Sequence, residues 1–157
     1  MSKELGTNVL VYVRPLGETG AFTVIAGQTS SQMTRARRTV DSTDKTTEGW
    51  ATSSPGLKEG TITCSGQCVW PDTDGLGVVD AAWDDETETG GLVEVYCQLN
   101  AAGKGYYGMA TVASADISGE TEDNTAYSLT FNPSSAMTSV AAMTIDRNAG
   151  TATIPAP

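Results

Sequence analysis

The segment GTITCSGQCVW, residues 60–70, decides the fold class of this chain. Successive side chains of an extended strand point to opposite faces, so a strand with one buried face alternates between apolar and polar residues. The apolar set in this segment is Ile62, Cys64, Cys68 and Trp70. The polar set is Thr61, Thr63, Ser65 and Gln67. The segment therefore predicts a β-strand that packs one face against a core.

Similar strand-like runs recur on both sides of this segment, separated by turn residues. They cover residues 8–14, 21–26 and 30–40 before it, and 92–99, 106–118 and 125–132 after it. Thr, Ser, Gly and Val are frequent in the sequence, whereas the helix formers Glu, Lys and Leu are scarce. The last two runs flank an acidic turn at 119–124, which predicts a hairpin. The pattern indicates an all-β protein.

One short helix is expected over residues 74–86, after Pro71. Its apolar side chains recur with a 3.6-residue period, at Leu76, Val79, Ala82 and Trp83. A side chain that can cap its first turn is available at Asp72, Thr73 or Asp74. The adjacent glycines at 90–91 would end the helical segment.

The chain is expected to form one β-sandwich or barrel domain over residues 1–135, followed by a strand or extended tail over 136–157. Residues 41–58 interrupt the domain with Thr, Ser, Asp, Gly and Pro and show no periodicity. So long an irregular segment inside a compact domain is usually a functional arm or a disordered insert. It contains Trp50, which a merely solvated linker would not require. We therefore expect a long protruding loop.

Charge and composition exclude several functions. The 157 residues carry 19 acids, 9 bases and no histidine, which gives a net charge of −10. The absence of histidine excludes a Ser-His-Asp triad and an HExxH zinc site. The acidic balance argues against a protein that grips nucleic acid by its phosphates. Residues 1–60 contain seven bases and six acids, whereas residues 61–157 contain two bases and thirteen acids, which favours a polarised folded surface.

The cysteines are not expected to form a complete disulfide framework or a metal site. Cys64, Cys68 and Cys97 are odd in number, and their spacing without histidine does not fit zinc. Core packing is expected for Cys64 and Cys68. The apolar run at 9–13 is too short for a signal-peptide core or a membrane span. We expect a soluble protein with reduced thiols, no cofactor, no metal and no membrane insertion.

The single basic patch consists of Arg35, Arg37 and Arg38, inside the polar run at 30–40. Alternation places Arg35 and Arg37 on one strand face and Arg38 on the other. Two interpretations remain open: the arginines pair with acids that follow in the loop, or they dock to an acidic neighbour. A nucleic-acid site is not favoured, because no aromatic residues are interleaved with the arginines.

The order of several short pieces resembles one known family. GQTS at 27–30 leads into the polar strand and TVDST at 39–43, and GW at 49–50, PG at 55–56 and PDTD at 71–74 follow. This order resembles the major tail tube proteins of long-tailed bacteriophages, of the TP901-1 and lambda-like kind, and their gene-transfer-agent relatives. The similarity covers residues 6–133 and leaves the C-terminal tail outside.

The resemblance implies a β-sandwich or barrel with a flanking helix, six copies of which form a ring. Stacked rings would make a tube for DNA ejection, with the long loop reaching a neighbouring subunit or ring. The chain would be a structural protein of the virion tail, not an enzyme, assembled in the host cytoplasm. Its partners would be other copies of itself, the tape-measure protein, and the tail terminator and distal tail proteins, with DNA passing transiently and non-specifically.

Two sets of site residues follow from this resemblance and from the charge pattern. The set expected at inter-subunit and ring-stacking contacts is Arg35, Arg37, Arg38, Thr46, Thr47 and Trp50. The acidic set expected to line the channel, where it would repel phosphates, is Glu94, Asp116, Glu120 and Glu122. Alternation indicates which residues share a face, but it does not indicate which face lines a channel.

Two rival functions remain open. A carbohydrate- or receptor-binding β-sandwich of a phage particle would expose an aromatic platform at Tyr106, Tyr107 or Trp83. Such a module would be monomeric or trimeric. A hydrolase would instead use the adjacent carboxylates of Asp84 and Asp85, and it would lose activity when either acid is neutralised.

Overall fold

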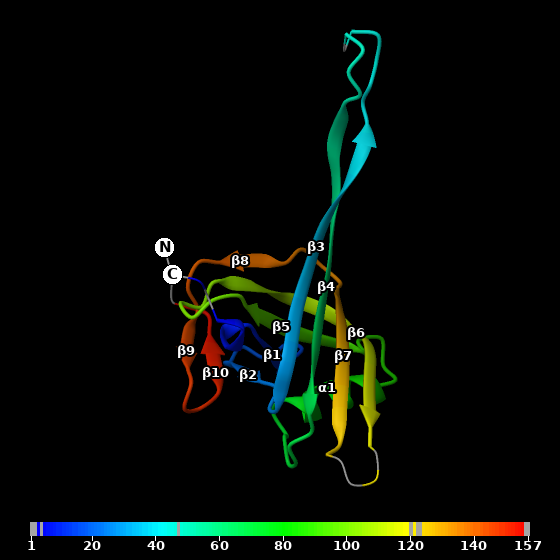
Figure 1. Cartoon of the computed structure of the whole chain (residues 1–157). Helices are drawn as coiled ribbons and strands as arrows, with labels where there is room; N and C mark the ends of the chain where they lie inside the picture. Colours follow the sequence, from blue (N-terminus) through cyan, green and yellow to red (C-terminus); the bar gives the residue numbers. More distant parts are fainter. Residues whose placement is uncertain (1–2, 4, 47, 120, 122–123, 156–157) are drawn as a thin grey trace.

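A computed structural model describes residues 3, 5–46, 48–119, 121 and 124–155, and these form ten β-strands, one α-helix and one 3-10 turn (Figure 1). The strands are β1 (Leu10–Pro15), β2 (Phe22–Val24), β3 (Gln28–Asp41), β4 (Ser53–Gln67), β5 (Leu92–Gln98), β6 (Gly105–Ser118), β7 (Ala126–Pro133), β8 (Thr138–Val140), β9 (Thr144–Asp146) and β10 (Thr151–Thr153). The helices are η1 (Gly6–Asn8) and α1 (Leu76–Asp84).

The strands form one antiparallel sheet in the order β3-β4-β7-β6-β5-β1-β2-β10-β9, and β8 adds to β6. β6 connects the two halves of this sheet, because its first half pairs with β5 and its second half with β7. The register shifts between Val112 and Ser114, and such a shift bends a strand. β6 thereby joins a layer that contains β5 and β1 to a layer that contains β7, β4 and β3.

The two layers enclose one apolar core. The first layer contributes Val11, Val13, Val93, Val95 and Cys97. The second layer contributes Ile62, Cys64, Tyr127, Leu129 and Phe131. In the second layer the buried residues alternate along β4 and β7, as in a sheet with one face against a core. The first layer is buried on both faces, because Tyr12 of β1 and Tyr96 of β5 point away from this core into a second apolar cluster. The expected all-β sandwich with one short helix is confirmed.

β4 includes most of the strand predicted from residues 60–70, but it begins earlier, at Ser53, and ends earlier, at Gln67. It ends at Gln67, which lies opposite Ala126, the first residue of its partner β7. Cys68 is half-buried at the edge of the core, whereas Trp70 is 57% exposed. The prediction that Trp70 belongs to the buried face is wrong, because none of the described strands continues the ladder beyond Gln67.

The short helix α1 begins and ends two residues inside the expected interval 74–86. The carboxylate of Asp72 accepts a hydrogen bond from the amide of Leu76 (3.1 Å) and so satisfies a donor of the first turn. Leu76 and Val79 are buried in the core, and α1 contacts β1, β5 and β6. Trp83 is 60% exposed, so its expected place on the apolar face is wrong. Within the described part of the chain, no helix has the length and apolar character that crossing a membrane would require.

β3 and β4 continue beyond the body as a two-stranded hairpin, here called the arm, residues 36–59 (Figure 1). Residues 53–58, which we expected in an irregular loop, form the first part of β4 and pair with the end of β3. The sequence pattern misses them because both faces of the arm are largely exposed, and no buried face imposes a period of two. Irregular structure in the arm is limited, among the described residues, to 42–46 and 48–52.

The C-terminal tail joins the sheet. β8 pairs with β6, β10 pairs with β2, and β9 pairs with β10. Met143 and Ala152 are buried in a second apolar cluster with Tyr12, Phe22 and Tyr96. The described part of residues 136–157 therefore contains three short strands, where we expected a single strand or an extended end.

Cys64, Cys68 and Cys97 are free thiols. Burial raises the thiol pKa of Cys64 to about 11 and that of Cys97 to about 12. Both thiols therefore stay protonated at neutral pH and act as small apolar side chains. The core-packing interpretation is confirmed for Cys64, while Cys68 packs at the margin of the core.

Candidate functional site

The arm carries three apolar side chains that the rest of the described chain leaves uncovered. Val40 on β3 is 58% exposed, Leu57 on β4 is 73% exposed, and Trp50 in the connection is 75% exposed. Apolar side chains gathered on one projecting element indicate a surface that another molecule covers. Trp50, one of the expected contact residues, thus lies where a neighbour can reach it.

Local hydrogen bonds and backbone geometry order the connection at the end of the arm. A carboxylate oxygen of Asp44 accepts hydrogen bonds from the amide (2.8 Å) and the hydroxyl (2.6 Å) of Thr46. Glu48 and Gly49 have φ angles of 54° and 83°, a left-handed conformation that reverses the chain. Thr46 is therefore held in place by Asp44, while Thr47, which was expected beside it, lies outside the described residues.

The structure divides the expected arginine cluster. Arg35 donates a hydrogen bond to the hydroxyl of Tyr106 (3.1 Å), and its guanidinium carbon lies 5.5 Å from the centroid of that ring. Arg37 lines the same groove as Arg35. Arg38 forms an ion pair with Glu59. The acid that pairs with an arginine here therefore comes from the facing strand β4, and not from the connection that follows β3.

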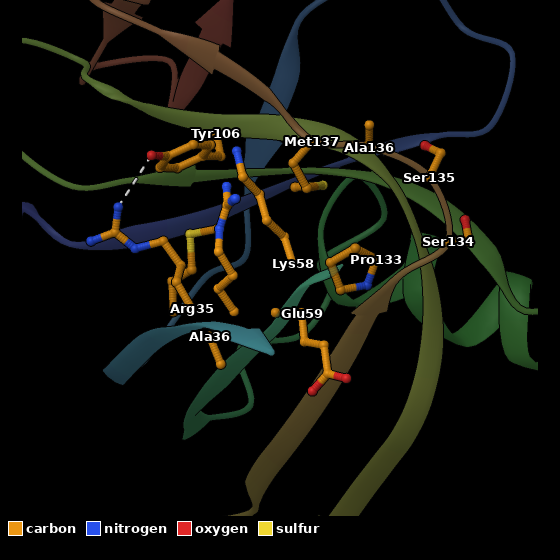
Figure 2. A pocket seen from close by; sticks show the side chains of 13 residues that line it. Arg35, Ala36, Lys58, Glu59, Tyr106, Pro133, Ser134, Ser135, Ala136 and Met137 are labelled. Carbon is orange, nitrogen blue, oxygen red and sulfur yellow. Dashed lines mark hydrogen bonds between the residues drawn. The ribbon is translucent and has the colours of Figure 1, made fainter. Parts of the chain in front are cut away.

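Arg35 and Arg37 lie in a groove of about 890 Å³ at the root of the arm (Figure 2). Its walls come from β3, β4, β6, the last residue of β7 and the segment that follows it. The cations that line it are Arg35, Arg37 and Lys58. The apolar part of its wall consists of Met33, Pro133 and Met137. Its single acid, Glu59, is already paired with Arg38, so the groove is a cationic surface with an apolar wall.

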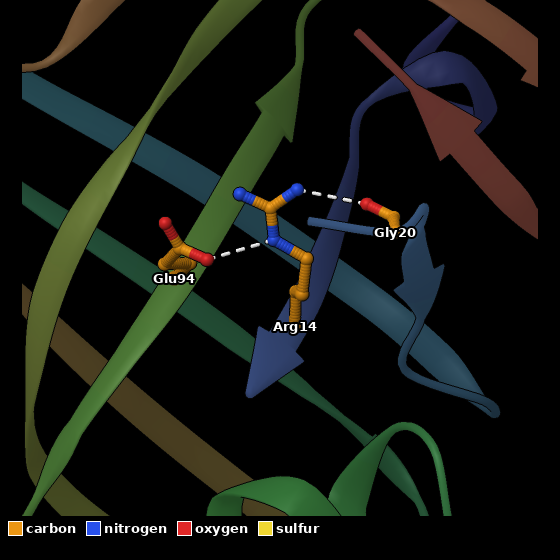
Figure 3. A network of polar contacts seen from close by, with 3 residues as sticks. All are labelled: Arg14, Gly20 and Glu94. Carbon is orange, nitrogen blue, oxygen red and sulfur yellow. Dashed lines mark hydrogen bonds and ion pairs between the residues drawn. The ribbon is translucent and has the colours of Figure 1, made fainter. Parts of the chain in front are cut away.

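Glu94, expected in the channel wall, has a counter-ion of its own (Figure 3). It accepts a hydrogen bond from Nε of Arg14 at 2.7 Å, and Arg14 also donates to the carbonyl of Gly20 at 2.8 Å. The guanidinium carbon of Arg14 lies 4.2 Å from the centroid of the Phe22 ring. The Arg14 side chain is 9% exposed and that of Glu94 is 24% exposed. The pair carries no net charge, so Glu94 adds little negative potential to any surface.

Replacing Arg14 with methionine should lower the free energy of unfolding by about 3 kcal/mol, because the Glu94 carboxylate would keep its partial burial and lose its counter-ion. The melting temperature should fall by roughly 6–12 °C for a domain of this size. Thermal unfolding followed by circular dichroism measures this. Arg38→Met is the matched control, since the Arg38 and Glu59 side chains are 70% and 48% exposed. That change should cost about 1 kcal/mol or less, and equal losses in the two variants would contradict the role of burial.

Of the expected channel acids, only Glu94 and Asp116 belong to the described residues, and these two lie in different layers. Asp116 lies on the second half of β6, is exposed, and faces Ser128 across the pair with β7. Glu120 and Glu122 lie outside the described residues. Glu94 lies on β5, in the other layer.

Asp116 belongs to a broad polar face on the side of β3, β4, β7 and β6 that points away from the core. The residues of this polar face lie beside one another across the paired strands, and nearly all of them carry hydroxyl or amide side chains. Its members are Ser30, Gln32, Thr34, Thr61, Thr63, Ser65, Gln67, Thr111, Ser114, Asp116, Ser118, Ser128, Thr130 and Asn132. Asp116 is the one charged residue in this set. Alternation in residues 60–70 identifies the β4 members, whereas the bulge in β6 conceals those after Val112.

Two edges of this four-stranded layer lack a partner among the described strands. β3 pairs with β4 on one side only. β6 pairs with β5 as far as Thr111, so residues 113–118 have only β7 beside them. Unpaired edges of this length expose backbone donors and acceptors that favour pairing with another strand.

The residues of the two rival functions do not form a site. Tyr106 lies in the groove beside Arg35, Tyr107 packs against Phe22 with ring centroids 6.2 Å apart, and Trp83 lies on α1. These aromatic rings therefore do not share a surface. Asp84 and Asp85 are exposed at the end of α1, and hydrogen bonds from Thr87 lower the pKa of Asp85. A general acid requires the opposite shift.

Sequence and structure comparisons agree with one another. A family model described as phage tail tube protein matches residues 3–139. The tail of an empty gene transfer agent (GTA) particle, refined with C6 symmetry, aligns with a TM-score of 0.73 and 22% identity, covering 88% of this chain and 100% of that chain. The virion of a native GTA particle aligns with a TM-score of 0.73 and 21% identity, with coverage of 88% and 100%.

A third solved structure, the SPP1 tail tube determined by solid-state NMR and cryo-electron microscopy, is more distant. It aligns with a TM-score of 0.64 and 13% identity, covering 83% of this chain and 75% of that chain. No curated protein is significantly similar to the chain in sequence. At these identities the solved structures establish a shared fold.

Proposed function

We propose, because this chain belongs to the phage tail tube protein family, that its copies form six-membered rings that stack into the tube of a phage or gene-transfer-agent tail. The family match spans residues 3–139 and confirms the resemblance drawn from the order of the sequence pieces. Six copies per ring are supported by the C6 symmetry of the GTA tail, whose subunit shares this fold. The observation that carries the proposal is the pair of free sheet edges.

The two free edges suit a ring because their directions are opposite. The successive pairs β3–β4, β4–β7 and β7–β6 are all antiparallel, so β3 and β6 run in opposite directions. Rotation about a ring axis preserves these directions in every copy. β3 of one copy and residues 113–118 of the next would therefore form another antiparallel pair. Repetition would close a continuous barrel in which these edges are covered.

In such a barrel the polar face would line the channel. The opposite face of β3, β4, β7 and β6 is covered by the core, β1 and β5, so the polar face is the one left to point inward. Its hydroxyl and amide groups offer no cationic partner for phosphate, and its single carboxylate, Asp116, repels it. DNA would pass over a hydrated, nearly neutral wall. Asp116 would then lie in the channel and Glu94 outside it.

The arm would contact the neighbouring ring. Val40, Trp50 and Leu57 are exposed in the single copy and would be buried there, which supplies apolar area for stacking. The cationic groove lies at the root of the arm, so the charged contact would adjoin this apolar one.

The role we propose is structural and includes no enzymatic activity. The protein would assemble in the host cytoplasm, become part of the virion tail, and remain outside membranes. Its partners in the particle would be other copies of itself, the tape-measure protein inside the tube, and the terminator and distal tail proteins at the tube ends. Contact with DNA would be transient and independent of base sequence.

Electron microscopy of the purified protein in negative stain tests this function. Rings with six-fold symmetry, or tubes of constant diameter, are the expected result. A particle that remains a monomer or a trimer at every salt concentration would contradict the tube and favour a receptor-binding module.

A further inference from the structure

We propose that the cationic groove at the root of the arm receives the acidic segment 84–88 of a second copy of this chain. This inference rests on the proposed function and specifies one contact within it. The juxtaposition would place three cations of one copy against four carboxylates of the next.

The groove supplies the positive half of this contact. Its cations are Arg35, Arg37 and Lys58, and its one acid is engaged by Arg38. Arg35 is held over Tyr106 by the hydrogen bond and ring contact described above, which fixes its guanidinium toward the groove (Figure 2). A guanidinium held in this way loses less freedom when it binds a carboxylate. Its side chain keeps donors available for such a bond, because a guanidinium has five.

The segment 84–88 supplies the negative half. Its sequence is DDETE, and no lysine or arginine occurs between Lys58 and Lys104. All of its residues are exposed, and the segment begins at Asp84, the last residue of α1. Trp83, which precedes it, is 60% exposed. The apolar wall of the groove would receive this indole while the cations receive the carboxylates.

The two halves lie on different surfaces of one chain. The groove is built from β3, β4, β6, the end of β7 and the segment that follows it. Segment 84–88 begins instead at the last residue of α1, a helix that packs on β1, β5 and β6. A contact between two different surfaces of identical chains is heterologous, the type that builds rings and stacks.

DNA is a less suitable occupant of the groove than this segment. Met33 faces the core side of β3, and Arg35 and Arg37 follow it on the same side by alternation. Thr34, between Met33 and Arg35 in the sequence, lies on the opposite side of β3, which is the polar face. The arginines therefore point away from the face that would line the channel, and DNA inside the tube would not meet them.

Charge reversal and re-reversal test the contact. R35E/R37E and D84K/D85K should each raise the protein concentration needed for tube formation by about tenfold at low salt, since like charges would then oppose each other. Combining all four changes should restore assembly to within about threefold of wild type, because opposite charges meet again. K3E/K104E, which reverses two cations outside the groove, is the matched control and should assemble as wild type does. Sedimentation measures assembly, and circular dichroism melting confirms that each variant is folded.

The outcomes separate this contact from the proposed function. Tubes that form normally from both reversed variants would overturn the contact and leave the tube intact. If assembly is not restored in the variant that combines all four substitutions, another segment occupies the groove. A labelled peptide of residues 81–89 provides a readout that does not require tubes: it should bind the wild-type protein at low salt and bind R35E/R37E about tenfold more weakly. Equal peptide binding by both proteins would also overturn the proposal.

Discussion

Replacing residues 42–52 with the dipeptide Asn-Gly should give a folded protein that no longer forms tubes. Asp41 and Ser53 are a register pair at the end of β3 and β4, so a two-residue turn can close the shortened hairpin. The replaced segment includes Trp50, whose side chain is 75% exposed and contributes nothing to the core. The change would therefore remove inter-ring contact area while leaving the sandwich unaltered.

We expect the melting temperature of the shortened protein to stay within about 4 °C of wild type, which corresponds to roughly 1 kcal/mol. Tube yield, measured by sedimentation and negative-stain microscopy, should fall by at least about tenfold, since the loss of one buried tryptophan already removes about 2–3 kcal/mol per contact. The matched control is Lys45→Ala, which changes an exposed side chain of the same segment, keeps the arm at full length and retains Trp50. Long tubes from the shortened protein would show that stacking does not depend on the arm.

The sandwich could be predicted because its core imposes a period on the sequence. Ile62 and Cys64 alternate with threonines since one face of β4 packs against the core, beside Leu129 and Phe131 of the neighbouring strand β7. The same rule fails on the arm, where residues 53–58 pair with β3 but face solvent on both sides. It also fails at Trp70. β4 ends at Gln67 because its partner β7 begins at Ala126, and the sequence around residues 60–70 does not indicate where that partner begins.

The sites were harder to predict because they depend on residues far apart in the chain. In the sequence Glu94 has the appearance of an unpaired surface acid, because its partner Arg14 lies eighty residues earlier. Tyr106 joins Arg35 across seventy-one residues, so the groove has no local sequence signature. The acidic channel was inferred from net charge, yet charge alone does not identify the face that carries it. The polar face was visible in residues 61–67, but its extent became apparent only from the register of four strands.

Replacing Thr63 with lysine should convert a tube that does not bind DNA into one that does. Thr63 lies near the middle of the polar face, between Gln32 on β3 and Thr130 on β7. One added cation per copy would repeat around every ring and along the whole tube. Each lysine that neutralises a phosphate releases a counter-ion, so binding of a short linear duplex should increase by about tenfold or more and weaken steeply with salt.

The location of the added charge can be tested by the shape of the DNA. Thr153→Lys is the matched control: it makes the same substitution at an exposed position on β10, away from the polar face. Tubes of Thr63→Lys should co-sediment with short linear duplexes but not with closed circular plasmid, which has no end that can enter a channel. Tubes of Thr153→Lys should show no such preference for linear DNA, because an outer lysine meets both forms alike. If Thr63→Lys tubes bind plasmid as well as they bind linear duplex, the polar face lies on the outside of the tube, and the channel must be lined by the layer that contains β1 and β5.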